Sequence, residues 1–280
     1  MACRVFSFHS PVDPMTAEDE RLIETYVRRP AALDASTRRR VQALVAADAE
    51  AQAWKAVLQS TYDVFDAMSE DVPRVVDRFV DRLFNPPTHV PLTPMDQARP
   101  TVLSADTRPT GRFESLAVLS SKENGVLVRI LRDKKRNEGR VYVLARDEQA
   151  YRDAMFESGD ERLQVPLTQD GFGRFANASD VPSEALKHGQ LRRCLWKGPI
   201  TAGETPTDRL HVADGYVVRA EWSDSETLKL HTTTRNADRP ALRWASVDDG
   251  GAVEMIRFDD QTATIALPLD DNERTLRLFG

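Results

Sequence analysis

Residues 34–48 read DASTRRRVQALVAAD, and this stretch contains the start, the apolar stripe and the end of one amphipathic helix. Asp34 is a natural N-cap, because its carboxylate can accept hydrogen bonds from the free N–H groups of the first helical turn. Val41, Leu44 and Val45 recur at helical spacing on one side. The final aspartate can cap a further helix. The stretch therefore predicts one helix with neighbours on both sides.

A first helix is predicted immediately before this stretch. Thr16 can cap it, and Asp19 stands at the third helical position, where it can complete a capping box. Leu22 and Tyr26 fall on one face together with their apolar neighbours. Pro30 ends the pattern, because proline cannot continue a helix interior.

Two longer patterns follow the quoted stretch. The third predicted helix starts at Asp48, and its apolar face is Trp54, Val57, Leu58, Thr61, Phe65 and Met68. A fourth helix is predicted from Pro73 to about Phe84, and its apolar face is Val76, Phe79, Val80 and Leu83. Asn85 and the two prolines after it end that helix.

These short helices need a packing partner, since isolated helices below about 12–15 residues are marginal in water. In one interpretation all their stripes form the interior of a small bundle. In the other, some stripes remain for a second protein, because an uncovered stripe would be an exposed apolar patch. On the second interpretation the candidate partner-binding residues are Leu22, Tyr26, Trp54, Leu58, Val76, Phe79, Val80 and Leu83.

The helical segment resembles a known family. The runs DERLIETYV at residues 19–27 and RRRVQALVAAD at residues 38–48, with Leu33–Asp34 between them, are similar to the N-terminal sigma-binding domain of bacterial anti-sigma factors. Many members carry a His-x-x-x-Cys-x-x-Cys zinc site, whereas residues 16–84 contain neither His nor Cys, so the resemblance is to the zinc-free type. It implies helices that wrap a sigma factor and hide its polymerase-binding surface.

Composition narrows the class of protein. The chain has 280 residues, of which 41% are hydrophobic and 29% charged, enough for two domains of an ordinary globular kind. A net charge of −6 argues against direct nucleic-acid binding through phosphate neutralisation. Two cysteines, Cys3 and Cys194, make no disulfide framework and favour a reducing compartment. We find neither a secretory leader nor an apolar run long enough to span a membrane, so we expect a cytoplasmic protein.

The predicted organisation has four parts. They are a flexible tail at residues 1–15, a helical partner-binding module at 16–85, a Pro-rich linker at 86–112 and an antiparallel β-sandwich region at 113–280. The last part is one large sandwich or two small ones, divided near residues 180–190. The linker is either a plain spacer or a protease-sensitive hinge. Translation starts at Met1 or at Met15, where the helical pattern begins.

The β prediction rests on short alternating runs separated by turns. The expected strands are Leu116–Ser120, Val126–Leu131, Arg140–Ala145, Arg162–Val165, Tyr216–Glu221, Thr227–Thr232, Ala241–Ala245, Val253–Phe258, Thr262–Ala266 and Thr275–Phe279. Turns are expected where glycine follows Asn124, Asp170, Asp214 and Asp249. A short helix or an elaborated loop is expected at residues 147–156.

We expect no catalytic, metal or cofactor site. Aspartate pairs begin at positions 248, 259 and 270, which is the spacing of hairpin turns, and no D-x-D-x-D-G loop accompanies them to suggest calcium. The histidines are scattered, and no serine lies in a G-x-S-x-G elbow. The runs at 38–40 and 132–136 are basic, and we interpret them as a solvated helix face and a hairpin tip.

Two functions remain, and neither is enzymatic. The first is a cytoplasmic regulator like the anti-sigma factors, which sequesters a sigma factor through its helices and carries a β-rich part that senses a signal or binds a second protein. The second is a β-sandwich that binds a ligand or acts as a scaffold, with the helices as an N-terminal cap.

Overall fold

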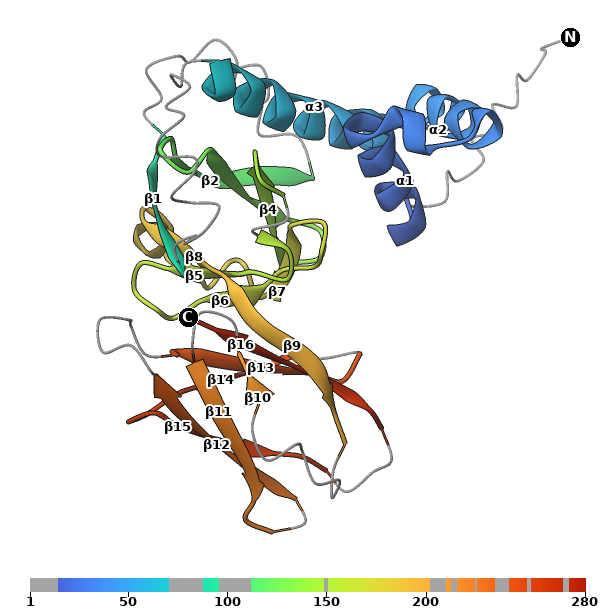
Figure 1. The fold of residues 1–280 in the computed structure, drawn as a ribbon. Helices are drawn as coiled ribbons and strands as arrows, with labels where there is room; N and C mark the ends of the chain where they lie inside the picture. The colour runs from blue at the N-terminus through green and yellow to red at the C-terminus, as the bar shows by residue number, and fades with distance from the viewer. Residues whose placement is uncertain are drawn as a thin grey trace, which may run out of the picture. The chain divides into compact units, whose positions relative to one another are not determined.

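The computed structural model describes residues 15–70, 88–95, 112–148, 151–201, 210–212, 216–224, 226–234, 242–250, 253–268 and 272–280. The chain divides into two compact units. The helical unit comprises Met1–Ala67 and Gln97–Glu114, and the β unit comprises Met68–Asp96 and Ser115–Gly280. Figure 1 shows the three α-helices of the first unit and the strands of the second.

The helical unit contains α1 (Ala17–Arg28), the short 3-10 helix η1 (Pro30–Ala32), α2 (Ala35–Ala47) and α3 (Ala49–Glu70). The predicted caps are confirmed. Thr16 Oγ1 accepts a hydrogen bond from the Asp19 N–H at 3.2 Å, and the Asp19 carboxylate accepts one from the Thr16 N–H, which makes a capping box. Asp34 Oδ1 accepts hydrogen bonds from the N–H groups of Ser36 (2.8 Å) and Thr37 (2.9 Å).

The third helix also follows the sequence pattern. Asp48 Oδ1 accepts a hydrogen bond from the Glu50 N–H at 2.7 Å, so this aspartate ends α2 and begins α3. Most of the predicted apolar face is buried, including Trp54, Leu58 and Met68, and Phe65 is half-buried. The predicted fourth helix, with Val76, Phe79, Val80 and Leu83, lies outside the described residues.

The first half of the β unit is a nearly closed antiparallel barrel. Its strands are β1 (His89–Pro94), β2 (Phe113–Ser121), β3 (Val126–Asp133), β4 (Glu138–Ala145), β5 (Met155–Ser158), β6 (Gln164–Pro166), β7 (Phe172–Ala176) and β8 (Gly189–Arg192). They lie in the order β6-β5-β8-β1-β2-β3-β4-β7, and the end strands β6 and β7 contact each other. A 3-10 helix, η4 (Ser183–Leu186), precedes β8. Val128, Val141 and Phe156 are in the barrel core.

The barrel differs from the predicted sandwich, and the physical reason is strand β1. The prolines at 91 and 94 suggested a spacer, because proline cannot donate to a strand ladder. In the structure this segment pairs with β8 along His89–Leu92 and with β2 at Thr93 and Pro94. It therefore joins two sets of strands into one curved sheet of eight. Residues 86–87 and 96–111 of the predicted linker lie outside the described residues.

The second half of the β unit has two four-stranded antiparallel sheets. Their strands are β9 (Cys194–Ile200), β10 (Leu210–His211), β11 (Tyr216–Trp222), β12 (Thr227–Thr234), β13 (Trp244–Asp248), β14 (Val253–Arg257), β15 (Thr262–Ala266) and β16 (Arg274–Phe279). The sheet orders are β10-β11-β12-β15 and β14-β13-β16-β9. Val218 and Ile265 of the first sheet share a core with Ala245 and Leu276 of the second, so the two sheets pack face to face.

The β region is thus antiparallel throughout, as predicted, but the sequence missed several short strands. β1, β5, β7, β8, β9 and β10 have no counterpart in the expected set. The turn glycines Gly125, Gly171 and Gly250 have positive φ angles of 60°, 73° and 87°, which confirms three of the four predicted turns. The fourth, at residues 214–215, lies outside the described residues. Among the helices described, none is long and apolar enough to cross a membrane.

Candidate functional site

The structure describes four of the eight residues that the sequence predicts to bind a partner, and all four lie in the helical unit. Leu22 and Tyr26, both on α1, are half-buried. The Tyr26 hydroxyl accepts a hydrogen bond from Gln42 Nε2 of α2 at 3.2 Å, and Lys55 Nζ of α3 lies 5.8 Å from the ring centre. Tyr26 therefore bridges the three helices and keeps part of its surface open.

Trp54 and Leu58 occupy the interior. Trp54 is 1% exposed, and its ring centre lies 4.5 Å from that of Phe113 at an interplanar angle of 37°. Leu58 is 2% exposed. Together they form the apolar centre of α3, so a partner could reach them only after the helix moved. Their role in binding stays a prediction, as does that of the four undescribed residues of the predicted fourth helix.

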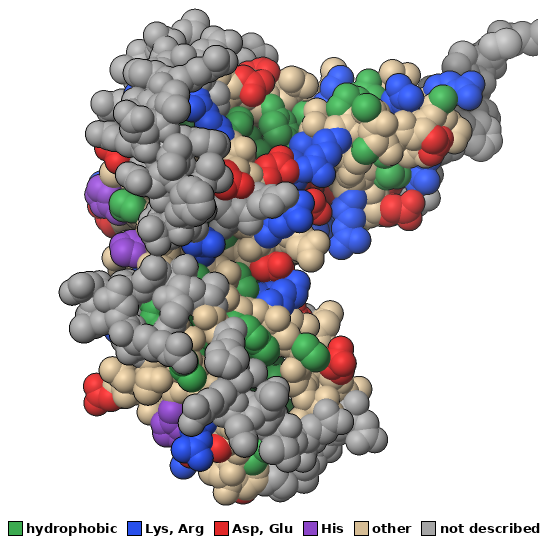
Figure 2. Space-filling model, viewed as in Figure 1, with side chains coloured by type: hydrophobic (Ala, Val, Ile, Leu, Met, Phe, Trp, Pro, Cys, Tyr) green, Lys and Arg blue, Asp and Glu red, His purple; other side chains and the backbone are tan. Residues whose placement is uncertain are grey.

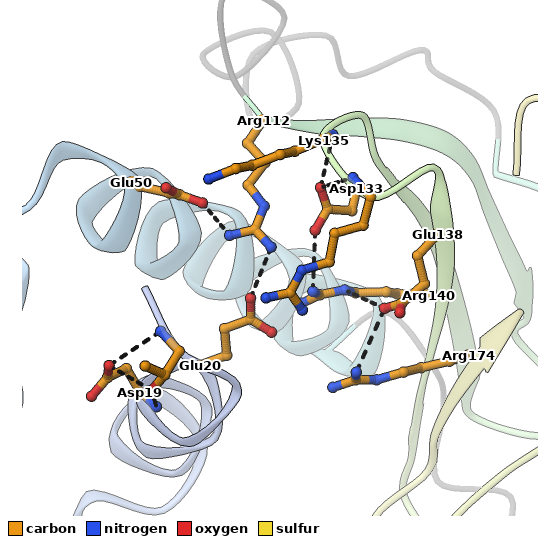
Figure 3. Close-up of polar contacts among 11 residues, drawn as sticks. Asp19, Glu20, Glu50, Arg112, Asp133, Lys135, Glu138, Arg140 and Arg174 are labelled. Carbon is orange, nitrogen blue, oxygen red and sulfur yellow. Dashed lines mark hydrogen bonds and ion pairs between the residues drawn. The ribbon is translucent and has the colours of Figure 1, made fainter. Parts of the chain in front are cut away.

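A buried ion-pair network holds the helical unit together (Figure 3). The guanidinium of Arg112 is 8% exposed and pairs with Glu20 of α1 at 3.1 Å and with Glu50 of α3. Its Cζ also lies 4.9 Å from the centre of the Phe113 ring, within reach of a cation–π interaction. The Arg112 side chain thus links α1 and α3 through two glutamates that are 30 positions apart in the sequence. Arg112 falls in the predicted linker and is not among the predicted site residues.

A signal for this network was present in the sequence. Glu20 lies on the same helical face as Ile23, and Glu50 on the same face as Trp54, so each is an acidic residue inside an apolar stripe. Glu20 is 3% exposed. Because a buried carboxylate requires a cation or several hydrogen bonds, the pattern calls for an arginine or lysine from elsewhere in the chain. It does not say which one.

The face of the helical unit that Figure 2 shows carries charged side chains with apolar side chains between them. Arg38, Arg39 and Arg40 are exposed, as the solvated-face interpretation predicts. Arg40 pairs with Glu18 at 3.4 Å and with Asp19 at 3.3 Å, which adds an exposed link between α1 and α2. Exposed pairs of this kind contribute little to stability but can guide association.

The second basic run forms a hairpin tip in the barrel, as predicted. Asp133 ends β3, and its Oδ1 accepts hydrogen bonds from the N–H groups of Lys135 (3.0 Å) and Arg136 (3.3 Å). Its Oδ2 pairs with Arg140 of β4 at 3.3 Å, where both side chains are almost fully buried (Figure 3). The basic run is therefore shaped by one aspartate at its base, and we assign it a structural role.

The structure gives no catalytic or metal-binding geometry to the other reactive groups that it describes. Burial raises the pKa of the Cys194 thiol to about 11, so it stays protonated and unreactive near neutral pH. Asp248 accepts a hydrogen bond from the Gly250 N–H at 2.9 Å, which is turn geometry. Within the described ranges, no group of three or more His, Cys, Asp or Glu side chains is placed to hold a metal ion.

Comparison with known proteins does not assign the chain. No model of a known protein family matches it, and a search of curated proteins found no match.

Proposed function

We propose that the protein is a non-catalytic regulator that binds a partner protein through its helical unit, and that the partner is a bacterial sigma factor. On this proposal the helices cover the surface by which the sigma factor contacts RNA polymerase. The β unit would then respond to a signal or bind a second protein. No chemical step is required, because steric masking alone inhibits.

The observation that carries the proposal is the arrangement of α1, η1, α2 and α3. An acidic, capped first helix leads through a short connection to an Arg-rich second helix, which breaks at Asp48 before a longer third helix. This order is what the resemblance implies. The half-buried Leu22 and Tyr26 lie on α1 next to exposed charges, and apolar anchors within a polar rim are typical of protein interfaces.

The proposal gives the named residues two roles. Leu22 and Tyr26 would contact the partner directly, as would Val76, Phe79, Val80 and Leu83 of the predicted fourth helix. Trp54 and Leu58 would hold the helices in the arrangement that presents those contacts, since they are buried. Interface energy is usually concentrated in a few apolar or aromatic anchors, so single changes should have large effects.

The test is co-expression of the full chain with each sigma factor of a bacterium that encodes it, followed by co-purification. One sigma factor should co-purify, and the complex should fail to support transcription by added polymerase. The double change Phe79→Glu with Leu83→Glu should weaken the complex at least about tenfold, because it places charges in an apolar contact. Gln52→Glu, at an exposed position of α3, is the control and should bind normally.

Two outcomes would contradict the proposal. One is that no sigma factor co-purifies although the chain is folded. The other is a complex that tolerates both Phe79→Glu with Leu83→Glu and Leu22→Glu, since binding would then use another surface.

A further inference from the structure

The β unit contains a cavity of about 370 Å³ where the barrel meets the two-sheet part. Its size is at the lower end of the range for small-molecule sites. The barrel contributes side chains from β1 and β8, and the other part contributes the segment before β13 and the end of β14. The lining residues are His89, Gln190, Arg192, Leu242, Arg243, Arg257 and Phe258.

A buried carboxylate fixes one side of this cavity. Glu157 of β5 is 0% exposed, and it accepts hydrogen bonds from Gln190 Nε2 (2.5 Å), Arg192 Nε (2.6 Å) and Trp244 Nε1 (2.8 Å). Arg192 also donates from Nη1 to the main-chain oxygen of Gly280 at 3.1 Å. The Nε and Nη1 donors of Arg192 thus hold its guanidinium group in place. Its Nη2 makes no hydrogen bond to any residue that the structure describes.

A second carboxylate holds the other two guanidinium groups. Glu161 accepts a hydrogen bond from Arg243, and its Oε2 lies 3.5 Å from Arg257 Nη1. The hydrogen bond from Arg243 lowers the pKa of Glu161, so this carboxyl is ionised at neutral pH. The side chain of Arg257 is 58% exposed, which places it at the mouth of the cavity, whereas that of Arg192 is 6% exposed.

Three guanidinium groups gather around the cavity beside two side-chain carboxylates, Glu157 and Glu161. One of the three, Arg192, also donates to the Gly280 oxygen. Burial, followed by repulsion from Arg192, lowers the pKa of His89 and keeps it neutral at pH 7. Burial is also the first cause of the lowered pKa of Arg192, and the charge on Arg243 contributes. An anion in the cavity would relieve this crowding.

The cavity also has an apolar wall. Leu242 is 2% exposed and Phe258 is 7% exposed, and both line it. Arginine presents paired N–H donors that match the oxygens of a carboxylate or phosphate. Donors held in advance by other side chains bind better, because less conformational freedom is lost when the ligand arrives.

We propose that this cavity binds a small ligand that carries an oxyanion, a carboxylate or a phosphate group, joined to an apolar group. The oxyanion lies against Arg192, Arg243 and Arg257, and the apolar group lies against Leu242 and Phe258. The inference concerns binding by the β unit, and it stands whether or not the helical unit binds a sigma factor.

The test is calorimetric titration of the full chain with inorganic phosphate, phenyl phosphate and benzoate at constant ionic strength set with chloride. Phenyl phosphate or benzoate should bind saturably at one site and more tightly than inorganic phosphate. Whichever of the two binds better identifies the oxyanion. In Arg257→Gln the better ligand should bind about tenfold more weakly, the size expected for losing one charge-assisted contact. Arg162→Gln is the matched control, because its side chain is 81% exposed and outside the cavity lining, and it should bind normally.

A second readout separates binding from a purely structural role of the arginines. His89 should titrate below its ordinary pKa of 6.5 in the free protein, and by NMR its pKa should rise when the better ligand is added. The proposal is supported if the ligand binds saturably, if binding raises the pKa of His89, and if the Arg257→Gln variant binds more weakly or not at all. The proposal is overturned if none of the three probes binds beyond chloride, or if binding is the same in Arg257→Gln and Arg243→Gln as in the natural chain.

Discussion

The two units each contain a buried cluster of charges, but the ratio of arginines to carboxylates is reversed between them. In the helical unit one guanidinium, that of Arg112, lies between the carboxylates of Glu20 and Glu50. In the β unit the carboxylates of Glu157 and Glu161 lie among the guanidinium groups of three arginines, and those arginines line a cavity.

The difference shows what separates a structural ion pair from a candidate binding site. Removing charges from water costs several kcal/mol for each ion, and the partner must offset that cost. Arg112 is enclosed by its acidic partners and by the Phe113 ring, so its charge serves the packing of the helices. Arg257 keeps more than half of its surface in contact with solvent and has donors left to offer. Space beside the cation, together with its charge, is what separates the proposed binding site from a structural ion pair.

The largest effect is expected for Glu157→Leu. The change leaves Arg192 buried without its carboxylate and removes the acceptor of Trp244, and it should destabilise the β unit by about 3–5 kcal/mol. Denaturant unfolding followed by tryptophan fluorescence measures it. Glu254→Leu, at an exposed position of β14, should change stability by less than about 0.5 kcal/mol. Equal stabilities for the two variants would show that the contacts of Glu157 do not stabilise the β unit.

The next effect is expected for Arg112→Met. This change keeps the apolar stem but leaves Glu20 buried without this cation, so the helical unit should lose about 3 kcal/mol. Loss of circular dichroism at 222 nm during heating reports the helices, and the unfolding of the β unit should stay where it was. A shift confined to the β unit would show that Arg112 does not serve the helices.

Thr16→Ala should have a smaller effect on the same unit. The substitution removes the side-chain acceptor of the capping box and should cost about 1 kcal/mol. Thr16→Ser, which retains the acceptor, is the control. If the alanine and serine variants melt alike, the capping contact contributes nothing to the stability of α1.

Acid should weaken the β unit through Glu161. Its pKa is lowered in the folded protein by the hydrogen bond from Arg243, so the stabilisation is present above the ordinary value of 4.5 and is lost as pH falls through the folded pKa. Asp160 and Asp224 have lowered pKa values as well, so the measurement is a difference between the natural chain and Glu161→Gln. The two stability curves should converge as pH falls from 6 to 3. Parallel curves would mean that Glu161 is not linked to folding.

The smallest effect is expected for Arg40→Ala. Its side chain is 59% exposed, and its pairs with Glu18 and Asp19 are exposed or solvated, so stability should change by at most about 0.5 kcal/mol. A larger loss would place Arg40 in the same class as Arg112. It would also erase the distinction between exposed and enclosed pairs in this unit.

The helices could be predicted because their signals are local. Thr16, Asp34 and Asp48 each act within three residues of their own position, so the sequence shows them directly. The barrel could not be predicted in this way. Strand β1 comes from a proline-containing segment and pairs with β8, which lies about a hundred positions away. The alternation in β1 is limited to the buried Val90 and Leu92, and the pairing partner of so short a strand depends on the whole sheet.

The cavity could not be predicted from the sequence for a related reason. His89, Arg192, Arg243 and Arg257 come from four separate segments, and none of these segments has unusual charge. For the helical unit, the candidate residues were visible as stripes, but their burial was not. Trp54 and Tyr26 look alike in the pattern, yet only the fold makes one an interior side chain and the other a half-open one.

The passage from β8 to β9 consists of one residue, Arg193, whose N–H donates to the carbonyl oxygen of Thr88 at 2.9 Å. Such a tether has two soft dihedral angles. Trp244 Nε1 also donates to Glu157, and Arg192 donates to the Gly280 oxygen, so rotation of the barrel against the two-sheet part would have to break both hydrogen bonds. Fluorescent labels on β4 and β12 should accordingly report little change of orientation or of separation when the cavity is filled.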